Sequence, residues 1–319
     1  MNDIDLGKSP SRPMRGARAR PPAVANGLRI AIAATLIGVS TLLHVLPLFA
    51  ITLVKAVLPF DAVRRACNPS LTGIAESWIG FNSWMIERVT HTRLVVEGDH
   101  ALRRDGHYLV LANHQSWVDI PVLQKVFNRR IPLLRFFLKS QLFWIPLMGL
   151  AWWALDFPFM KRYSRAALAR RPELAGRDVE ATRRACVRFR EIPVAVMNFI
   201  EGTRFTEAKH AAQGSPYRFL LRPKAGGVAF VLHAMGDGLQ SILDVTLVYP
   251  DGRPDFADLL ADRIGTVHVE VRERPIPAEF TTGDYQGDAV FRARFQAWMN
   301  AIWADKDASI ARLQGIARR

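Results

Sequence analysis

The chain has 319 residues, half of them hydrophobic, which is enough for one large domain or two modest domains with a full core. Its formal net charge of +14 favours anionic partners: nucleic acid, acidic lipid headgroups or a phosphorylated substrate. The two cysteines, Cys67 and Cys186, lie far apart and near no histidine cluster. They argue against a disulfide framework and a zinc site, and they indicate a reducing compartment.

The chain begins with a basic, proline-containing tail, residues 1–28, which we predict to be disordered. The next segment, Ile30–Val54, contains no Asp, Glu, Lys or Arg, and a helix needs only about 20 such residues to cross a bilayer core. It is also too long for the apolar part of a signal peptide. Residues 29–90 are therefore predicted to be a membrane-anchoring helical region.

The path of this apolar segment is open between three interpretations. Arg29 and Lys55 flank it, so both sides are basic and the charge pattern does not orient it. Pro47 is expected to kink a helix because it removes one backbone hydrogen bond. The segment is then a single crossing, a bent segment that enters and leaves one leaflet, or a buried core helix.

The elements after the apolar segment alternate between helices and strands. Leu71–Arg88 has helical spacing with two tryptophans, which suits either a membrane interface or a helix facing the core. Strands are expected where short apolar runs are bounded by turn residues. The expected strands are Leu94–Val96, Tyr108–Leu111, Val194–Ile200, Leu243–Val248 and Val267–Val271, and the expected helices are Ser116–Val126, Arg177–Arg190 and Gly226–Met235.

This alternation predicts an α/β fold in layers, with a central sheet that is mostly parallel or mixed. Residues 91–319 are predicted to form this domain. Near its end, Phe291, Phe295, Trp298 and Ile302 recur at helical spacing, so the domain is expected to finish in amphipathic helices. Phe136–Trp153 is strongly apolar and is broken by a proline and a glycine.

The first candidate for chemistry is the pair His114 and Asp119. His114 follows an apolar strand in Asn113-His114-Gln115-Ser116, and an apolar helix comes next. If His114 lies on the turn and Asp119 on the first helical turn, the carboxylate can accept the imidazole Nδ1–H and fix its tautomer. Nε2 would then act as a general base toward a hydroxyl. His100 and Asp105 have the same spacing without that context, so position matters more than spacing.

The second candidate is the turn Glu201-Gly202-Thr203-Arg204, which also follows an apolar strand. Gly202 permits a sharp turn or a close backbone approach, Thr203 offers a hydroxyl, and Arg204 offers a bidentate fork for a phosphate. Taken alone, the turn is better explained as a plain strand-to-loop turn with a solvent-exposed salt bridge. Crevices at the carboxyl ends of strands bind ligands in α/β folds, so the two polar turns support each other.

Together these residues resemble the lysophospholipid (1-acylglycerol-3-phosphate) acyltransferase family, which carries an Asn-His-x4-Asp box and a later Phe-x-Glu-Gly-Thr-Arg box. The resemblance runs from about residue 90 to residue 250. It includes Lys139 and its neighbours, the segment Asp156–Arg162, and Val245–Pro250 as the hydrophobic-proline box. Phe205–Lys209 looks like the branch of lysocardiolipin and lysophosphatidylinositol acyltransferases and their bacterial relatives. Ile200 and Tyr249 depart from the common form of their boxes.

The resemblance implies acyl transfer from acyl-CoA or acyl-carrier protein to the free hydroxyl of a lysophospholipid, with 1-acylglycerol-3-phosphate as the first candidate. It implies His114 and Asp119 as the catalytic pair, and Glu201, Gly202, Thr203, Arg204, Lys139 and Asn113 as substrate-binding residues. Lys139 is equally well explained as a surface lysine, and Lys224 and Arg222 are further candidates. The stretch Leu142–Trp153 would line an acyl tunnel or simply pack in the core.

We expect no cofactor beyond the acyl donor, no metal, and membrane lipids rather than nucleic acid as further partners. The bacterial relatives imply an inner-membrane location with the catalytic domain on the cytoplasmic face. Motifs of serine hydrolases, P-loop and dinucleotide enzymes and zinc proteases are absent from the sequence. The alternative function is a non-catalytic, membrane-anchored protein that binds acidic lipid or nucleic acid through its basic surface.

Overall fold

The computed structural model describes residues 23–58, 60–98, 102–161 and 192–317, together with residues 170, 180, 183, 185–187 and 189. Most of the predicted tail, the comparison residue His100 and most of the predicted helix Arg177–Arg190 therefore lie outside the described residues. The first helix begins at Ala23, inside the segment assigned to the tail.

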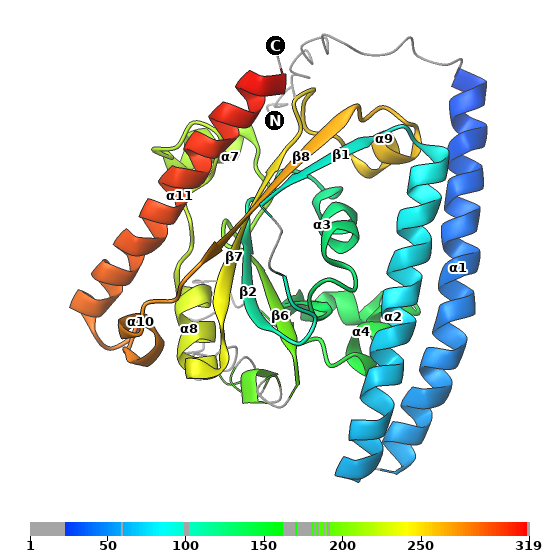
Figure 1. Cartoon of the computed structure of the whole chain (residues 1–319), viewed down its shortest axis with the longest axis horizontal. Coiled ribbons are helices and arrows are strands. Elements are labelled where there is room, and N and C mark those ends of the chain that lie inside the picture. The colour runs from blue at the N-terminus through cyan, green and yellow to red at the C-terminus, as the bar shows by residue number, and fades with distance from the viewer. Residues whose placement is uncertain are drawn as a thin grey trace.

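Two long helices form an antiparallel hairpin along one side of the molecule: α1 (Ala23–Val57) and α2 (Asp61–Val89) (Figure 1). The helix α1 continues through Pro47, so the chain reverses direction between Val57 and Asp61 instead of at the proline. Gly27–Val57 is long and apolar enough to span a membrane. Among the described helices it alone meets that test, whereas α2 is the second helix of the region predicted to anchor the chain.

The remaining described elements form the α/β domain, and they follow the apolar runs of the sequence closely. The strands are β1 (Arg93–Glu97), β2 (His107–Ala112), β3 (Leu134–Phe136), β4 (Leu138–Lys139), β5 (Phe159–Met160), β6 (Val194–Phe199), β7 (Ser241–Val248) and β8 (Thr266–Arg274). The helices are α3 (Asp119–Phe127), η1 (Ser140–Trp144), α4 (Met148–Ala154), α7 (Glu207–Gln213), α8 (Gly226–Met235), η3 (Gly236–Gly238), α9 (Phe256–Leu260), α10 (Glu279–Thr282) and α11 (Ala289–Ala317).

The central sheet has six strands in the order β1-β8-β7-β2-β6-β3. The four strands β7, β2, β6 and β3 run parallel to one another, whereas β8 is antiparallel to β7 and carries β1 alongside it. The sheet is therefore mixed, and it confirms the predicted α/β class. Strands β4 and β5 form a separate parallel pair beside the main sheet.

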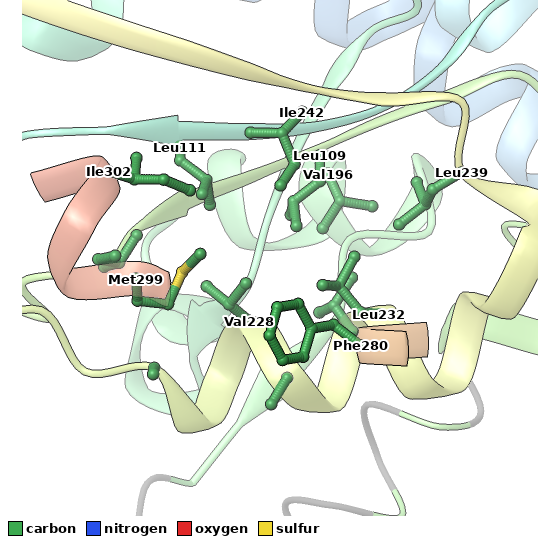
Figure 2. Close-up of a cluster of buried hydrophobic side chains, with 14 of the residues drawn as sticks. Leu109, Leu111, Val196, Val228, Leu232, Leu239, Ile242, Phe280, Met299 and Ile302 are labelled. Atoms are coloured by element: carbon green, nitrogen blue, oxygen red, sulfur yellow. The ribbon is translucent and has the colours of Figure 1, made fainter. Parts of the chain in front are cut away.

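Helices cover both faces of the sheet because its strands alternate side chains between two hydrophobic clusters. In β2, Leu109 and Leu111 face the cluster of α8, α10 and α11, drawn in Figure 2, while Tyr108 and Val110 face the cluster of α3. On the first side, Phe295 and neighbouring residues of α11 are fully buried, as the helical spacing predicts. The hairpin of α1 and α2 lies outside α3, which completes the layered arrangement seen in Figure 1.

Candidate active site

The polar residues singled out by the sequence converge because their strands are parallel neighbours. His114 follows β2, Glu201 follows β6 on one side of it, and Tyr249 follows β7 on the other side. The carboxyl ends of parallel strands meet at one edge of a sheet, and open α/β sheets bind their ligands there. Lys139, in the short strand β4 that follows β3, lines the same cavity as His114.

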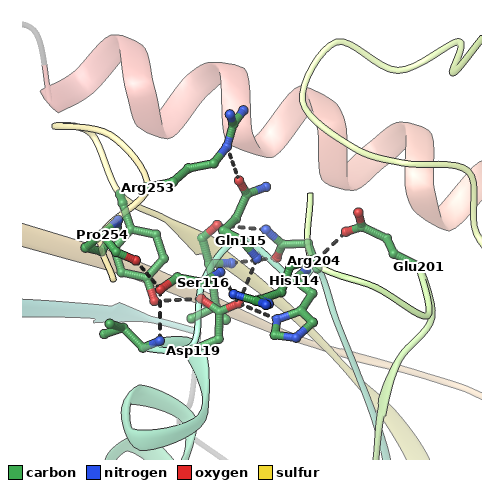
Figure 3. A network of polar contacts seen from close by, with 12 residues as sticks. His114, Gln115, Ser116, Asp119, Glu201, Arg204, Arg253 and Pro254 are labelled. Atoms are coloured by element: carbon green, nitrogen blue, oxygen red, sulfur yellow. Dashed lines mark hydrogen bonds and ion pairs between the residues drawn. The ribbon is translucent and has the colours of Figure 1, made fainter. Parts of the chain in front are cut away.

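His114 and Asp119 form a hydrogen-bonded pair at this edge (Figure 3). The imidazole Nδ1 lies 2.8 Å from Asp119 Oδ2, and the carboxylate is fully buried. Asp119 is the first residue of α3, so it faces back toward the loop that carries His114. The backbone N–H groups of Gln115 and Ser116 donate to the same oxygen, at 2.7 and 2.9 Å. With Nδ1 held, Nε2 is the ring nitrogen left for a substrate hydroxyl.

The imidazole is also packed in place by an aromatic ring. Phe199, the last residue of β6, stacks on His114 with ring centroids 4.0 Å apart and an interplanar angle of 14°. This contact links the two sequence boxes, as does the backbone hydrogen bond from Phe205 N to His114 O at 2.8 Å. The turn that carries the histidine is therefore fixed from the neighbouring strand as well as from α3.

Asn113 was predicted to bind substrate, but its side chain contacts the protein backbone instead. Its side chain is fully buried, its Nδ2 donates to Leu247 O at 2.9 Å, and its Oδ1 accepts from Leu247 N at 2.8 Å. The amide thus continues the β2–β7 pairing beyond the end of β2. This geometry gives no support to a substrate contact and fits a residue that positions His114, its neighbour in the chain.

Glu201 is likewise buried instead of facing a substrate. Its Oε1 accepts from His114 N and its Oε2 from Leu221 N, both at 3.1 Å, so it ties the histidine loop to a second loop. Burial raises the pKa of Glu201 from 4.5 to about 8, against the two backbone hydrogen bonds, which favour the charged form. The same value includes two smaller effects: the charge of Asp119 raises the pKa, and buried Lys306 on α11 lowers it.

The raised pKa of Glu201 predicts a pH-dependent loss of stability. Between pH 4.5 and about 8 the folded protein keeps this proton and the unfolded chain does not, so stability falls as pH rises through that window. Glu201→Gln cannot titrate. The unfolding temperature of the wild type, measured relative to Glu201→Gln in detergent, should therefore fall from pH ~5 to pH ~8. A difference that stays constant across this range would contradict the expectation.

The turn after Glu201 presents its residues toward the cavity beside His114. Gly202 has a φ of +71°, a conformation that favours glycine, and a Cβ there would lie 3.1 Å from Lys224 Nζ. Thr203 Oγ1 accepts from Lys209 Nζ at 2.8 Å. The guanidinium of Arg204 lies over the Trp117 ring, 4.4 Å from its centroid, and Arg204 is exposed.

A cavity of about 1140 Å³ joins these residues. His114, Gly202, Thr203 and Arg204 line it, and so do two further cations, Lys139 and Lys224. Three basic side chains beside one imidazole suit a phosphate-bearing substrate. Arg222 does not belong to this group, because its guanidinium bonds the carbonyl oxygens of Gln213 and Gly214.

A second cavity, of about 630 Å³, lies between the helical hairpin and the α/β domain. Its walls are mainly apolar, and they come from α1, α2, α3 and α4, with Met148, Ala151 and Trp152 from the last helix. The two cavities share four lining residues: Trp117, Ile120, Phe136 and Leu138. The apolar space therefore adjoins the space that contains His114.

The described residues include no group of three or more His, Cys, Asp or Glu side chains that could hold a metal.

Several contacts around the histidine loop could not be predicted from the sequence. Arg253, which follows β7, donates to Gln115 Oε1 and to Glu207 Oε1, and it stacks on Phe205. These contacts join segments far apart in the chain, so no local sequence pattern predicts them.

Comparison with known families agrees with this geometry. A family model described as Acyltransferase matches residues 93–250, from β1 to the residue after Tyr249. The match contains His114, Asp119 and the whole Glu201–Arg204 turn. These residues form an acyltransferase domain.

Relatives of this acyltransferase domain carry related names. The chain is 27% identical over 209 residues to "Probable 1-acyl-sn-glycerol-3-phosphate acyltransferase 5" of Arabidopsis thaliana, covering 61% of this chain and 52% of that protein. It is 25% identical over 253 residues to "Lysocardiolipin acyltransferase 1" of Danio rerio, covering 75% of this chain and 60% of that protein. The chain thus spans little more than half the length of these curated relatives.

The acyltransferase fold is shared with a solved structure. The crystal structure of the 1-acyl-sn-glycerophosphate (LPA) acyltransferase PlsC from Thermotoga maritima matches with a TM-score of 0.53 and 15% identity. The match covers 91% of this chain and 98% of that one. The family resemblance and the fold class expected from the sequence are confirmed.

Proposed function

We propose that the protein is a lysophospholipid acyltransferase, which moves a fatty acyl group from a thioester donor to the free hydroxyl of a lysophospholipid. The observation that carries the proposal is the imidazole of His114, oriented by buried Asp119 and lining a cavity with Arg204, Lys139 and Lys224. 1-Acylglycerol-3-phosphate is the first candidate acceptor. Lysocardiolipin is the second, by analogy with the name of the zebrafish relative.

The chemistry assigned to His114 is general-base catalysis. Nε2 takes the proton of the acceptor hydroxyl as that oxygen attacks the carbonyl carbon of the thioester. The resulting tetrahedral intermediate collapses with cleavage of the C–S bond, and the imidazolium returns its proton to the departing thiolate. No acyl-enzyme is needed, and Cys67 and Cys186 are not among the lining residues of the cavity that contains His114.

The two adjoining cavities suggest how the substrates are divided. The cations at the larger cavity would bind the phosphate groups of the acceptor or of acyl-CoA. The apolar cavity would take an acyl chain, because its walls are mainly hydrocarbon and it shares Trp117 and Phe136 with the cavity that contains His114. This assigns the α4 part of the Leu142–Trp153 stretch to an acyl-binding wall.

The helical hairpin is proposed to anchor the enzyme in one leaflet. Arg29 near the start of α1 pairs with Asp262 at 3.1 Å, and Lys55 near its end pairs with Asp156 at 2.9 Å. Both aspartates belong to the α/β domain, although the two basic residues are about 39 Å apart along the helix. A helix held at both ends by one polar domain does not cross the bilayer core, which is about 30 Å thick.

The face that would enter the membrane is apolar and exposed. Leu42, Leu43 and Leu46 of α1 are more than half exposed, and Trp144 and Trp153, at either end of the α4 region, are also exposed. Aromatic residues beside an apolar surface are typical of membrane interfaces. We propose the cytoplasmic side of an inner membrane, where acyl-CoA and acyl-carrier protein are available.

A labelling experiment separates one-leaflet insertion from a crossing. Single cysteines at Leu28 and Phe60, which are 63% and 65% exposed near the two ends of α1, would be introduced after replacement of Cys67 and Cys186. In sealed vesicles, a membrane-impermeant thiol reagent should label both from the same side. Val290→Cys, at the start of α11, reports the side of the α/β domain. Labelling of Leu28→Cys and Phe60→Cys from opposite sides would overturn one-leaflet insertion.

The function itself is tested with purified membranes and a panel of labelled lysophospholipids and acyl-CoAs of different chain lengths. The proposal predicts thiol release that depends on both substrates and a fatty acyl group on the acceptor. Binding to acidic vesicles without acyl transfer to any acceptor would favour the alternative, a membrane-anchored binder of acidic lipid or nucleic acid. That alternative accounts for the charge of +14 but not for the His114–Asp119 geometry.

A further inference from the structure

Tyr249 is a residue that departs from the common form of its box and yet contacts the proposed catalytic pair directly. It follows β7 immediately, at the same edge of the sheet as His114, and it is 7% exposed. Its hydroxyl donates to Asp119 Oδ1 at 2.7 Å. Burial and the neighbouring Asp119 raise the pKa of Tyr249 well above its usual value, so the phenol stays neutral and keeps its proton to donate.

The two oxygens of Asp119 have separate partners. Oδ2 accepts from His114 Nδ1 and from the backbone of Gln115 and Ser116. Oδ1 accepts from Tyr249, which comes from the strand on the other side of the histidine loop. Tyr249 therefore supplies the side-chain contact to Oδ1 within the part of the chain that the structure describes. The backbone N–H groups of Gln115 and Ser116, in the loop before α3, donate to Oδ2 instead.

We propose that Tyr249 is a positioning residue, whose phenol holds Asp119 in the orientation that orders His114 and weakens the attraction of this carboxylate for a protonated imidazole. The inference rests on the proposed function for its catalytic consequence, but not for the contact itself. A hydrogen bond to a carboxylate draws negative charge toward the donor. Without the phenol, Oδ1 of Asp119 loses this donor, and the carboxylate attracts a protonated imidazole more strongly.

Other charged groups also face this pair. Glu201 lies behind the histidine loop and interacts with Asp119 and with Lys306 of α11. Arg204, Lys139, Lys224, His233 and Asp284 line the same cavity as His114. Tyr249→Phe leaves all of these groups in place, so a change in titration after this substitution reports the phenol and not the wider field.

The principal test compares Tyr249→Phe with wild type in the full-length protein. Loss of the phenol proton should lower kcat about tenfold with little change in KM, because a hydrogen bond to a charged group is lost away from the substrate. The acid limb of the pH profile of kcat/KM should move to higher pH, since the unshielded carboxylate favours the protonated imidazole. Tyr217→Phe is the matched control, because Tyr217 bonds the carbonyl oxygen of Asn300 outside the pair.

A second variant keeps the test valid if Tyr249→Phe folds poorly. Replacing Tyr249 alone with 3-fluorotyrosine preserves the ring and hydroxyl but strengthens the donor, so the acid limb should move in the opposite direction, to lower pH. Titration of the His114 imidazole by NMR measures the shifts expected for the two Tyr249 variants without any turnover. The His114 signal is assigned as the one that disappears in His114→Ala. The NMR titration therefore tests the role of Tyr249 even if the protein shows no acyl transfer. Absence of acyl transfer would contradict the proposed function but not the contact between Tyr249 and Asp119.

The outcomes are distinct. Opposite shifts in the two Tyr249 variants, with none in Tyr217→Phe, would establish the positioning role. An unchanged pH profile and an unchanged His114 titration in Tyr249→Phe would overturn it. A lower kcat with no shift in either titration would overturn it as well, because a purely structural tyrosine would give that result.

Discussion

Replacing His114 with alanine should lower the rate of acyl transfer by about 10³-fold or more while leaving the protein folded and bound to membranes. The imidazole of His114 is assigned the proton transfer because buried Asp119 orients it at the cavity. Asp119 would keep three donors, from Gln115, Ser116 and Tyr249, so its carboxylate remains paired. The measurement is thiol release per enzyme, alongside thermal unfolding and vesicle binding.

Two controls separate the chemistry of His114 from a general loss of histidine or of His-x4-Asp spacing. His107→Ala removes a histidine at the opposite end of the same strand, β2, and should retain activity. Asp105→Ala removes the acid of the second His-x4-Asp pattern, where Asp105 is exposed and paired with Arg103. A His114→Ala protein that is folded and keeps the wild-type rate would refute the catalytic role of the pair.

Replacing Arg204 with alanine should raise KM for a phosphate-bearing acceptor about 10- to 100-fold, with a smaller effect on kcat. Its guanidinium lies over Trp117 at the cavity, within the same region as His114 but not bonded to it. Arg204→Lys should recover only part of the loss, because an ammonium cannot bind phosphate through a planar fork. The readout is KM and kcat for one lysophospholipid at fixed acyl-CoA.

Arg222→Ala is the matched control for Arg204. This arginine is also exposed and lies in the loop between α7 and α8, but its guanidinium bonds main-chain oxygens of Gln213 and Gly214. It should change stability slightly and leave KM unchanged. Equal KM values for Arg204→Ala and wild type would remove Arg204 from the phosphate site and leave Lys139 and Lys224 as its candidates.

Much of the fold was predictable because local patterns carry it. Apolar runs bounded by turn residues correspond to β1, β2, β6, β7 and β8, and Gly226–Met235 is a helix with the predicted bounds. Helical spacing likewise placed Phe295 and Ile302 in the core. The position of His114 directly after a strand favoured it over His100 as the catalytic histidine. That prediction depends on the parallel neighbours of β2, whose carboxyl ends lie beside the end of β2.

The parts that could not be predicted depend on contacts between distant segments. Asn113 and Glu201 are polar residues at strand ends, where a substrate contact is a reasonable expectation. Their hydrogen bonds instead depend on the register of β2 against β7 and on the position of the Leu221 loop. Likewise, the ion pairs of α1 with Asp156 and Asp262 join it to residues more than 90 positions away in the chain.

The most direct measurement of the central claim follows a labelled acyl group from acyl-CoA in purified wild-type protein supplied with lysophospholipid. We expect one labelled diacyl phospholipid for each thiol released, with no label held covalently on the protein. Vesicle binding with no labelled phospholipid from any acceptor would contradict acyl transfer. Label retained on the protein would contradict the direct attack assigned to the hydroxyl that His114 activates.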